Sequence, residues 1–333
     1  MENNPAAGNL FPGTEEIWKA KKRIAGLIEY TPLVYSAGLS KAYRASIYLK
    51  FEFIQPTKSF KIRGAANKIL SLSDEERQRG VATFSTGNHG LAVAYVAGKM
   101  GIPAAIFISE RVPEVKVNNL RALGVNLVIY GENQDDAEDY CYQKAEEEGW
   151  VVVKPFDDAM VISGQGTIGL EILEQLPNLD AVIVPLSGGG LISGIALALK
   201  NNLPRLKVIG VSMEGSPAMY HSLKAGEPVN LKEKNTLADS LLGGIGLDNK
   251  YTFSIVRNHV DDLVLVSEKR IASAMAALFR EDRIAVEGAA ATTVAALDEH
   301  NLIKPGSRVV LVLSGSNIDS LNFTRVIGDY LKS

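Results

Sequence analysis

Apolar residues along the chain gather in short runs, and segments long enough for a helix separate most of them. Each run has the length of one strand and is largely apolar, as expected for strands that are covered on both faces. The runs lie at residues 47–53, 81–85, 104–109, 126–130, 151–156, 181–186, 208–213, 262–267 and 308–314. Helices are predicted at residues 14–29, 91–100, 134–148, 191–200, 268–281, 287–300 and 318–331. The pattern therefore predicts an α/β fold with open, mainly parallel sheets and helices on both faces.

Composition places few further limits on the fold. The chain has 333 residues, more than a single hydrophobic core usually holds, and no Pro- or Ser-rich linker divides it. A second domain is therefore expected to be inserted into the first rather than appended to it. The net charge is −3 without a basic block, which gives no indication of a nucleic-acid partner.

The N-terminal segment and the single cysteine bear on the compartment. The segment has neither a basic start nor an apolar core, and no run approaches the ~20 apolar residues of a membrane helix. Cys141 cannot form an internal disulfide or a cysteine-based metal cluster, and we expect an ordinary thiol there. We expect a cytoplasmic protein that binds neither membrane nor nucleic acid.

Three predicted strand-to-helix loops carry the candidate chemistry. They are STGNHG (residues 85–90), SGGGL (187–191) and SGSN (314–317). Open α/β sheets bind ligands beyond the carboxyl ends of their strands, and the free N–H groups at a helix start attract anions. Each loop is therefore predicted to open a helix and to offer an anion site.

The glycine loop favours a phosphate, because three successive glycines let the backbone approach it closely. Two alternatives stay open: a tight turn in which glycine only permits packing, and a dinucleotide site with Glu214 on the ribose. Gly188, Gly190 and Gly194 are spaced one residue too far apart for the usual dinucleotide fingerprint. No Lys-Ser/Thr pair follows the glycines, which excludes a P-loop.

A lysine in a further turn, SFKIRGA, suggests pyridoxal phosphate, a phosphorylated aldehyde that a lysine holds as a Schiff base. Ser59 is predicted to cap a helix and to place Lys61 in its first turn. The helix dipole and desolvation should then lower the pKa of Lys61. Lys58 is expected to lie outside the turn and to point to solvent.

The five motifs SFKIRGA, STGNHG, SGGGL, EGAAA and SGSN, in this order, resemble the fold-type II pyridoxal-phosphate enzymes of the threonine/serine dehydratase and serine racemase group. The resemblance covers residues 15–330, and VPLSGGGL, GVSME and ADSLLGGIGLDN look like the dehydratases of hydroxyectoine utilisation. It implies a tryptophan synthase β-like fold with two open sheets and a homodimer. It also implies a small domain at residues 77–153, inserted into a large domain of residues 1–76 and 154–333, with the cofactor between them.

The resemblance further implies a role for each matching residue. Lys61 would hold the cofactor covalently and move the Cα proton, and Thr86 lies where racemases carry a second acid/base. The other implied cofactor contacts are Phe60 beside the ring, Asn88 at the 3′-oxygen, the N–H groups of Gly188, Gly189, Gly190 and Leu191 at the phosphate, and Ser314 and Glu287 near the pyridine nitrogen. Glu287 can equally be a plain helix N-terminal carboxylate. The substrate carboxylate would lie in the loop of Ser85, Thr86, Gly87, Asn88 and His89.

These roles predict a lyase that converts a small β-hydroxy amino acid into a 2-oxo acid and ammonia. Threonine, serine, threo-3-hydroxyaspartate and a hydroxylated diaminobutyrate derivative are all open as substrates. An amino-acid racemase and a non-catalytic cofactor-binding protein are the alternatives, and a dinucleotide-dependent oxidoreductase is a more distant one. Thr86 replaces the serine of many relatives, and its added methyl group makes racemisation less favoured.

Other departures from the family pattern concern a cation, a metal and the C-terminus. Relatives usually have glycine where this chain has Lys58. Ser212, Ala218 and Met219 fall where metal-stabilised relatives bind a divalent cation, so no metal site is expected, although Glu214 lies close by. Only residues 315–333 follow Ser314, and we expect no C-terminal regulatory domain.

Overall fold

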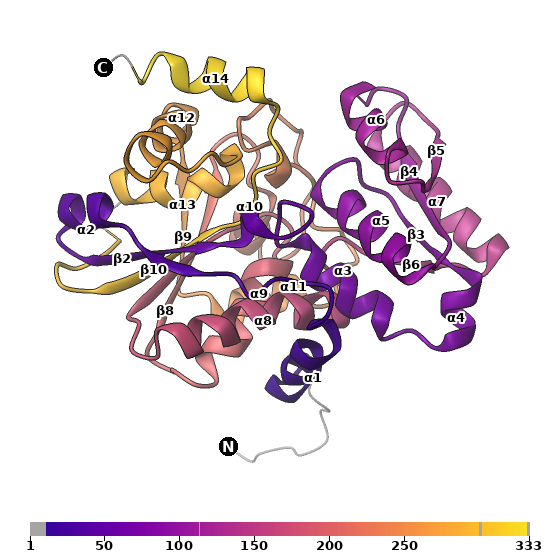
Figure 1. Ribbon diagram of the computed structural model, residues 1–333, viewed down its shortest axis with the longest axis horizontal. Coiled ribbons are helices and arrows are strands. Elements are labelled where there is room, and N and C mark those ends of the chain that lie inside the picture. The colour runs from indigo at the N-terminus through magenta and orange to yellow at the C-terminus, as the bar shows by residue number, and fades with distance from the viewer. Residues whose placement is uncertain (1–10, 113, 300–301, 332–333) are drawn as a thin grey trace.

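This computed structural model describes residues 11–112, 114–299 and 302–331, which form two sheets side by side (Figure 1). The larger sheet has the order β1-β2-β10-β7-β8-β9, in which only β1 runs antiparallel to its neighbour. Its strands are β1 (Leu33–Tyr35), β2 (Ser46–Phe51), β7 (Ala181–Pro185), β8 (Lys207–Met213), β9 (Asp262–Val266) and β10 (Arg308–Leu313). The smaller sheet, β5-β4-β3-β6, is parallel throughout. Its strands are β3 (Val81–Thr83), β4 (Ala104–Ile108), β5 (Asn126–Ile129) and β6 (Val151–Val152).

Helices cover both faces of the larger sheet because successive strand residues are buried on opposite sides. Val182 and Val310 belong to one core with α8 (Ala159–Gln175), α9 (Gly190–Lys200), α10 (Ala218–Ala225) and α11 (Thr252–His259). Ile183 and Leu311 belong to the other core, with α2 (Ala37–Tyr43), α12 (Glu268–Ala277), α13 (Gly288–Glu299) and α14 (Ser320–Gly328). The predicted α/β class with two mainly parallel sheets is confirmed.

The smaller sheet has its own helices. α4 (Asp74–Arg79) precedes its first strand, while α5 (Asn88–Met100) and α6 (Glu114–Arg121) pack on one face and α7 (Gln134–Glu148) on the other. All strands of this sheet lie within the range predicted for the inserted domain. The domain boundaries at residues 77 and 153 stay a prediction.

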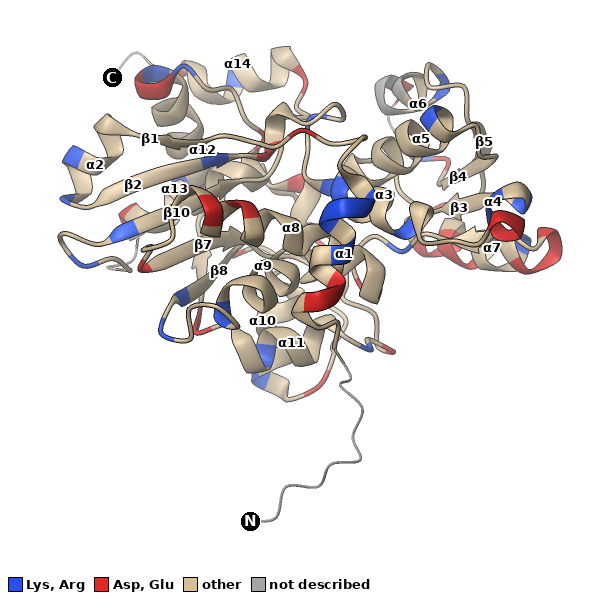
Figure 2. Ribbon diagram, turned by 60° about the horizontal axis from the view of Figure 1, so that its bottom comes forward, with Lys and Arg blue, Asp and Glu red and all other residues tan. Residues whose placement is uncertain are grey.

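α7 is rich in acidic residues, which are red along this helix in Figure 2. Its small residues Ala137, Cys141 and Ala145 are buried, and Cys141 and Ala145 belong to one core with residues of β3 and β4. Burial raises the pKa of the Cys141 thiol to about 12, with a smaller contribution from the Glu138 carboxylate. This thiol is therefore protonated and unreactive, as an ordinary buried cysteine is.

The sequence pattern did not predict α8, which is rich in glycine and apolar on most sides. Its glycines are needed because neighbouring helices approach closely. A Cβ at Gly164 would lie 2.5 Å from the Arg63 carbonyl oxygen in α3 (Lys61–Leu70), and one at Gly169 would lie 2.7 Å from Ala198 Cβ in α9. Close tertiary packing thus outweighs the low helix propensity of glycine.

A buried ionic network joins α3 to β2 and α8. Arg63 Nε donates to Glu52 Oε2 at 2.7 Å, and Arg63 Nη1 donates to Glu171 Oε1 at 2.6 Å. Lys50 Nζ donates to Glu171 Oε2 at 2.7 Å. These side chains are 0–3% exposed, so each charge depends on its partners for the interactions that water would otherwise give. The network fixes α3, and with it Lys61, against the larger sheet.

α1 (Thr14–Ile24) packs on α3, α8 and α9 at the outside of this region. None of the helices in the described residues has the length and apolarity that a membrane span requires.

We predict that Arg63→Met lowers the free energy of unfolding by about 3–5 kcal/mol, because it leaves two buried carboxylates with one buried cation. Urea denaturation of the cofactor-free protein measures the change. The control is Lys19→Met, which removes an exposed ion pair with Glu15 and should cost far less stability than Arg63→Met. Equal costs for the two variants would contradict a central role for the network.

Candidate active site

Lys61 is the first residue of α3, the helix that packs against both α5 of the smaller sheet and α8 of the larger one. The turn before it is held by the end of β10, since the Phe60 N–H donates to the Ser314 carbonyl at 3.0 Å. Ser59 pairs with Gly315 in an isolated β-bridge. This pairing brings the SFKIRGA and SGSN motifs together.

The prediction that Ser59 caps α3 is wrong. Phe60 is the N-cap residue and already has helical backbone angles, and the helix has no side-chain cap. The Ser59 hydroxyl is buried without a hydrogen-bond partner among the described residues. Its pairing with Gly315 holds Ser59 outside the cap position. Lys61 nevertheless lies in the first turn, as predicted, and Lys58 is exposed, as predicted.

The Lys61 amine is buried although the side chain as a whole is only half-buried. Its Nζ donates to the Pro155 carbonyl at 2.7 Å and lies 5.4 Å from the centroid of the Phe60 ring. Burial lowers the pKa of Lys61 to about 8, and the Glu287 carboxylate opposes the shift. A neutral amine is therefore accessible near physiological pH, as nucleophilic and basic chemistry requires.

The glycine loop opens α9 directly after β7, and the start of α9 has no side-chain cap. Gly189 has a φ of +91°, which favours glycine. A Cβ at Gly188 would lie 2.5 Å from the Phe156 ring, so close packing alone accounts for one of the glycines. The N–H groups of Gly190 and Leu191, in the first turn, have no acceptor within the helix. Packing and anion binding are thus compatible uses of this loop.

Phe156 connects the loop to the lysine, because it follows Pro155, whose carbonyl accepts from Lys61. The segment of Pro155 and Phe156 therefore contacts both the Lys61 amine, whose pKa is lowered, and the loop at the uncapped start of α9. This arrangement fits an aldehyde with an anionic tail, which is the chemistry of pyridoxal phosphate.

The loop of residues 85–90 opens α5 after β3, with Gly87 as N-cap and no side-chain cap. Ser85, Thr86 and Gly87 are partly exposed, while Asn88 and His89 are buried. The His89 Nε2 lies 2.8 Å from the Val153 carbonyl oxygen. Burial, with a contribution from the Lys61 charge, lowers the pKa of His89 to about 3. The ring is therefore neutral, and only the backbone of His89 remains available to an anion.

The prediction that SGSN opens a helix with an anion site is wrong. α14 begins only at Ser320, and the protein itself uses the N–H groups of the loop. The Ser316 N–H donates to the Lys58 carbonyl at 2.9 Å, and the Asn317 N–H donates to Glu287 Oε2 at 3.1 Å. Through these hydrogen bonds the loop holds Lys58 and Glu287 in place, and Ser314 is buried within it.

Glu287 is the centre of a buried cluster of hydrogen bonds. Its Oε1 accepts from Asn88 Nδ2 at 2.9 Å and from the Ser240 hydroxyl at 2.8 Å. Asn88 Oδ1 accepts from Asn317 Nδ2 at 2.6 Å, which fixes the orientation of the Asn88 amide. Burial raises the pKa of Glu287 above its ordinary value, and the hydrogen bonds from Ser240, Asn88 and Asn317 offset only part of this shift.

The roles of Ser240, Asn317 and Pro155 were not predicted from the sequence. Ser240 and Asn317 lie within the quoted motifs ADSLLGGIGLDN and SGSN, so the motifs themselves were a signal. Pro155 acts through its carbonyl, and no side-chain pattern could have indicated this contact.

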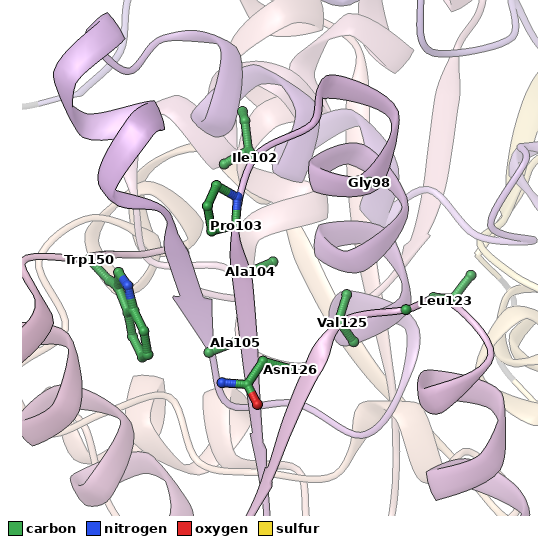
Figure 3. A pocket seen from close by; sticks show the side chains of 10 residues that line it. Gly98, Ile102, Pro103, Ala104, Ala105, Leu123, Val125, Asn126 and Trp150 are labelled. Carbon is green, nitrogen blue, oxygen red and sulfur yellow. The ribbon is translucent and has the colours of Figure 1, made fainter.

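A cavity of about 290 Å³ lies elsewhere, at the amino ends of β4 and β5 (Figure 3). Its lining includes residues 102–105, residues 123–126 and Trp150. The loop of residues 85–90 follows β3, which runs parallel to β4 and β5, so it lies at the carboxyl ends of these strands, on the opposite edge of the sheet from the cavity. This cavity is therefore not part of the candidate active site.

The fold and the site define a cofactor-dependent enzyme, and the chain belongs to the family described as pyridoxal-phosphate dependent enzymes, whose model matches residues 24–315. It is 43% identical to the L-threonine ammonia-lyase of Thermotoga maritima, over 94% of this chain and 77% of that protein. It is 40% identical to the catabolic L-threonine dehydratase of Escherichia coli K12, over 94% of this chain and 95% of that protein. The solved structure of maize serine racemase matches with a TM-score of 0.89 at 35% identity, over 96% of this chain and 98% of that one. The predicted family and its cofactor are confirmed.

We predict that Glu287→Gln lowers the pKa of Lys61 below about 8 in the cofactor-free protein, since the carboxylate is what opposes the shift. Reductive ¹³C-methylation followed by an NMR titration measures this pKa, and Lys61→Arg assigns the signal. Glu16→Gln on α1 is the control and should leave the pKa unchanged. A pKa in Glu287→Gln that equals or exceeds that of the wild type would contradict the electrostatic assignment.

The same shift has a consequence for stability. The pKa of Lys61 is about 8 in the folded protein and 10.5 for an ordinary lysine, so the unfolded chain binds more protons between these values. The contribution of Lys61 to the free energy of unfolding of the cofactor-free protein should therefore rise as the pH increases from about 8 to about 10.5. Because other groups also titrate in this range, the measured quantity is the difference in the free energy of unfolding between the wild type and Lys61→Met, which should shift in favour of the wild type as the pH rises. A difference that shifts in favour of Lys61→Met would contradict the assignment.

Proposed function

We propose that this chain is a pyridoxal-phosphate-dependent ammonia-lyase that converts a small β-hydroxy amino acid into a 2-oxo acid and ammonia. The observation that carries the proposal is the buried Lys61 amine, with its lowered pKa, next to two uncapped helix starts. The names of the Thermotoga and Escherichia relatives support the reaction class.

The proposed site holds the cofactor through several groups. Lys61 would be the covalent anchor, and Phe60 would pack beside the ring. The N–H groups of Gly188, Gly189, Gly190 and Leu191 bind the phosphate at the start of α9. When bound, pyridoxal phosphate supplies an electron sink for the pair that remains when the Cα–H bond breaks.

The protein positions the substrate and moves its proton. The backbone of Ser85, Thr86, Gly87 and His89 binds the substrate carboxylate at the start of α5. Lys61 accepts the Cα proton, for which an amine with a pKa of about 8 is a suitable base. The β-hydroxyl then takes up one proton and leaves as water, and water hydrolyses the released enamine to the 2-oxo acid and ammonia. Ordered binding between the two helix starts supplies the orientation.

Ser314, Asn88 and Glu287 adjust the far end of the ring. Ser314 would be the group at the pyridine nitrogen, where a hydroxyl, unlike a carboxylate, would not keep that nitrogen protonated and so would favour prompt elimination. Asn88 would be the group at the 3′-oxygen. Glu287, with Ser240 and Asn317, holds the Asn88 amide in the required orientation.

The proposal includes an inserted domain at residues 77–153 and a homodimer, both of which the family resemblance supports, and a cytoplasmic location, which the single cysteine, Cys141, supports. Elimination is favoured over racemisation because the Thr86 methyl group crowds the position of the second acid/base. Gel filtration with light scattering tests the dimer.

We predict that the purified protein, supplied with pyridoxal phosphate, releases ammonia and a 2-oxo acid from at least one β-hydroxy amino acid. The panel is L-threonine, L-serine, threo-3-hydroxyaspartate and a 3-hydroxylated 2,4-diaminobutyrate. Lys61→Ala should lower kcat/KM by at least about 10³-fold. Lys68→Ala, on the same helix, is the matched control and should stay within about 3-fold of the wild type, since the ion pair of Lys68 in the described residues is with Asp158.

Chiral chromatography of the remaining amino acid separates the alternatives. Loss of optical purity without ammonia would indicate a racemase. Spectroscopic evidence of bound cofactor without turnover of any panel member would indicate a binding protein.

A further inference from the structure

Lys58 has a backbone conformation that a side chain disfavours. Its φ is 58°, in the left-handed region, which costs a non-glycine residue about 1 kcal/mol or more. Two other described non-glycine residues have positive φ, but Arg44 and Arg283 are C-cap residues, where this conformation is common. Lys58 lies in a turn closed by its own N–H and the Gln55 carbonyl, at 2.7 Å. Glycine would suit this position better, so the lysine side chain calls for an explanation.

The turn around Lys58 is fastened to the candidate active site. Asn317 Nδ2 donates both to the Thr57 carbonyl, at 2.9 Å, and to Asn88 Oδ1, at 2.6 Å. The Lys58 carbonyl accepts from the Ser316 N–H at 2.9 Å. Thr57 and Asn88 therefore meet at one amide group. Lys58 is thus one residue away from a carbonyl that shares its hydrogen-bond donor with Asn88, in the loop of residues 85–89, and a lysine side chain has a flexible four-carbon stem.

The Lys58 side chain is exposed, and no ion pair or hydrogen bond joins its ammonium to another residue in the described part of the chain. The two other lysines of this region do have partners: Lys61 donates to Pro155, and Lys68 pairs with Asp158 at 2.7 Å. An unpaired cation on a strained turn at the edge of the site is therefore available to an anion that the protein does not supply.

We propose that Lys58 binds a second anionic group, carried by the side chain of the substrate. The start of α5 then takes the α-carboxylate and Lys58 takes the β-carboxylate. The preferred substrate class becomes β-hydroxy amino acids with an acidic side chain, of which 3-hydroxyaspartate is the simplest. This inference rests on the proposed ammonia-lyase function and selects among its substrates.

The test compares threo-3-hydroxyaspartate with L-threonine as substrates of the cofactor-loaded enzyme. The wild type should prefer the acidic substrate by at least about 10-fold in kcat/KM. Lys58→Met should lower the ratio of the two kcat/KM values by about 10- to 100-fold, mainly through the KM of the acidic substrate, and Lys58→Arg should retain most of it. Higher ionic strength should reduce the ratio in the wild type and not in Lys58→Met.

Two further variants separate the effect of the Lys58 charge on the ratio from an effect of the substitution on folding. Lys58→Gly removes the charge and the backbone strain together, so it should lower the ratio as Lys58→Met does while raising the Tm. Lys68→Met is the matched control on α3 and should leave the ratio within about 2-fold of the wild-type value. Calorimetry with succinate, a dicarboxylate without an amine, gives an independent readout: the wild type should bind it at least about 10-fold more tightly than Lys58→Met.

The outcomes distinguish the inference from the function on which it rests. One outcome is that the enzyme turns over threonine while Lys58→Met and Lys58→Gly leave the ratio of the two kcat/KM values unchanged. That result would overturn the inference and leave the lyase function intact. Absence of turnover with all four panel members would overturn the proposed function. In that case the succinate measurement decides the inference, and equal affinities of the wild type and Lys58→Met would overturn it.

Discussion

The ion pairs of Arg63 with Glu52 and Glu171 fix the helix on which the proposed chemistry depends. Arg63 lies two residues after Lys61 in α3, so the position of the amine follows from the position of the guanidinium. Both carboxylates are buried, one in the segment after β2 and one in α8, which ties α3 to the larger sheet. The other side of α3 packs against α5, whose first turn carries the proposed carboxylate-binding loop. The helix α3 thus relates the nucleophile directly to the loop at the start of α5, and it relates the nucleophile to the start of α9 through α8.

Electrostatic balance in the site follows from this placement. The Lys61 amine is buried with one carboxylate, Glu287, close enough to raise its pKa, and burial lowers the pKa more strongly. Glu287 is itself restrained by Ser240, Asn88 and the Asn317 backbone. The site therefore combines a partly neutral base with a restrained carboxylate, and a base with a pKa near the operating pH suits the proton transfer proposed at the substrate Cα. Two uncapped helix starts add positive potential where a phosphate and a carboxylate are proposed to bind.

Much of this arrangement could be predicted from the sequence, because local rules govern it. Apolar runs located the strands other than β1, and motif order located the family, the lysine and the glycine loop. The failures at Ser59, at the SGSN loop and at α8 share one cause, which is contact between segments far apart in the chain. Ser59 pairs with Gly315 rather than capping its own helix, and the SGSN loop donates to Lys58 and Glu287 rather than to an anion. Likewise, α8 is helical because its glycines fit against α3 and α9.

The covalent attachment of the cofactor to Lys61 is the central claim, and it can be measured directly. The protein is loaded with pyridoxal phosphate, reduced with borohydride and digested, and the peptides are mapped by mass spectrometry. The account predicts one phosphopyridoxyl group, on the peptide that contains Lys61, with Lys58 and Lys68 unmodified. A label on another lysine, or no label on a protein that binds the cofactor, would contradict it.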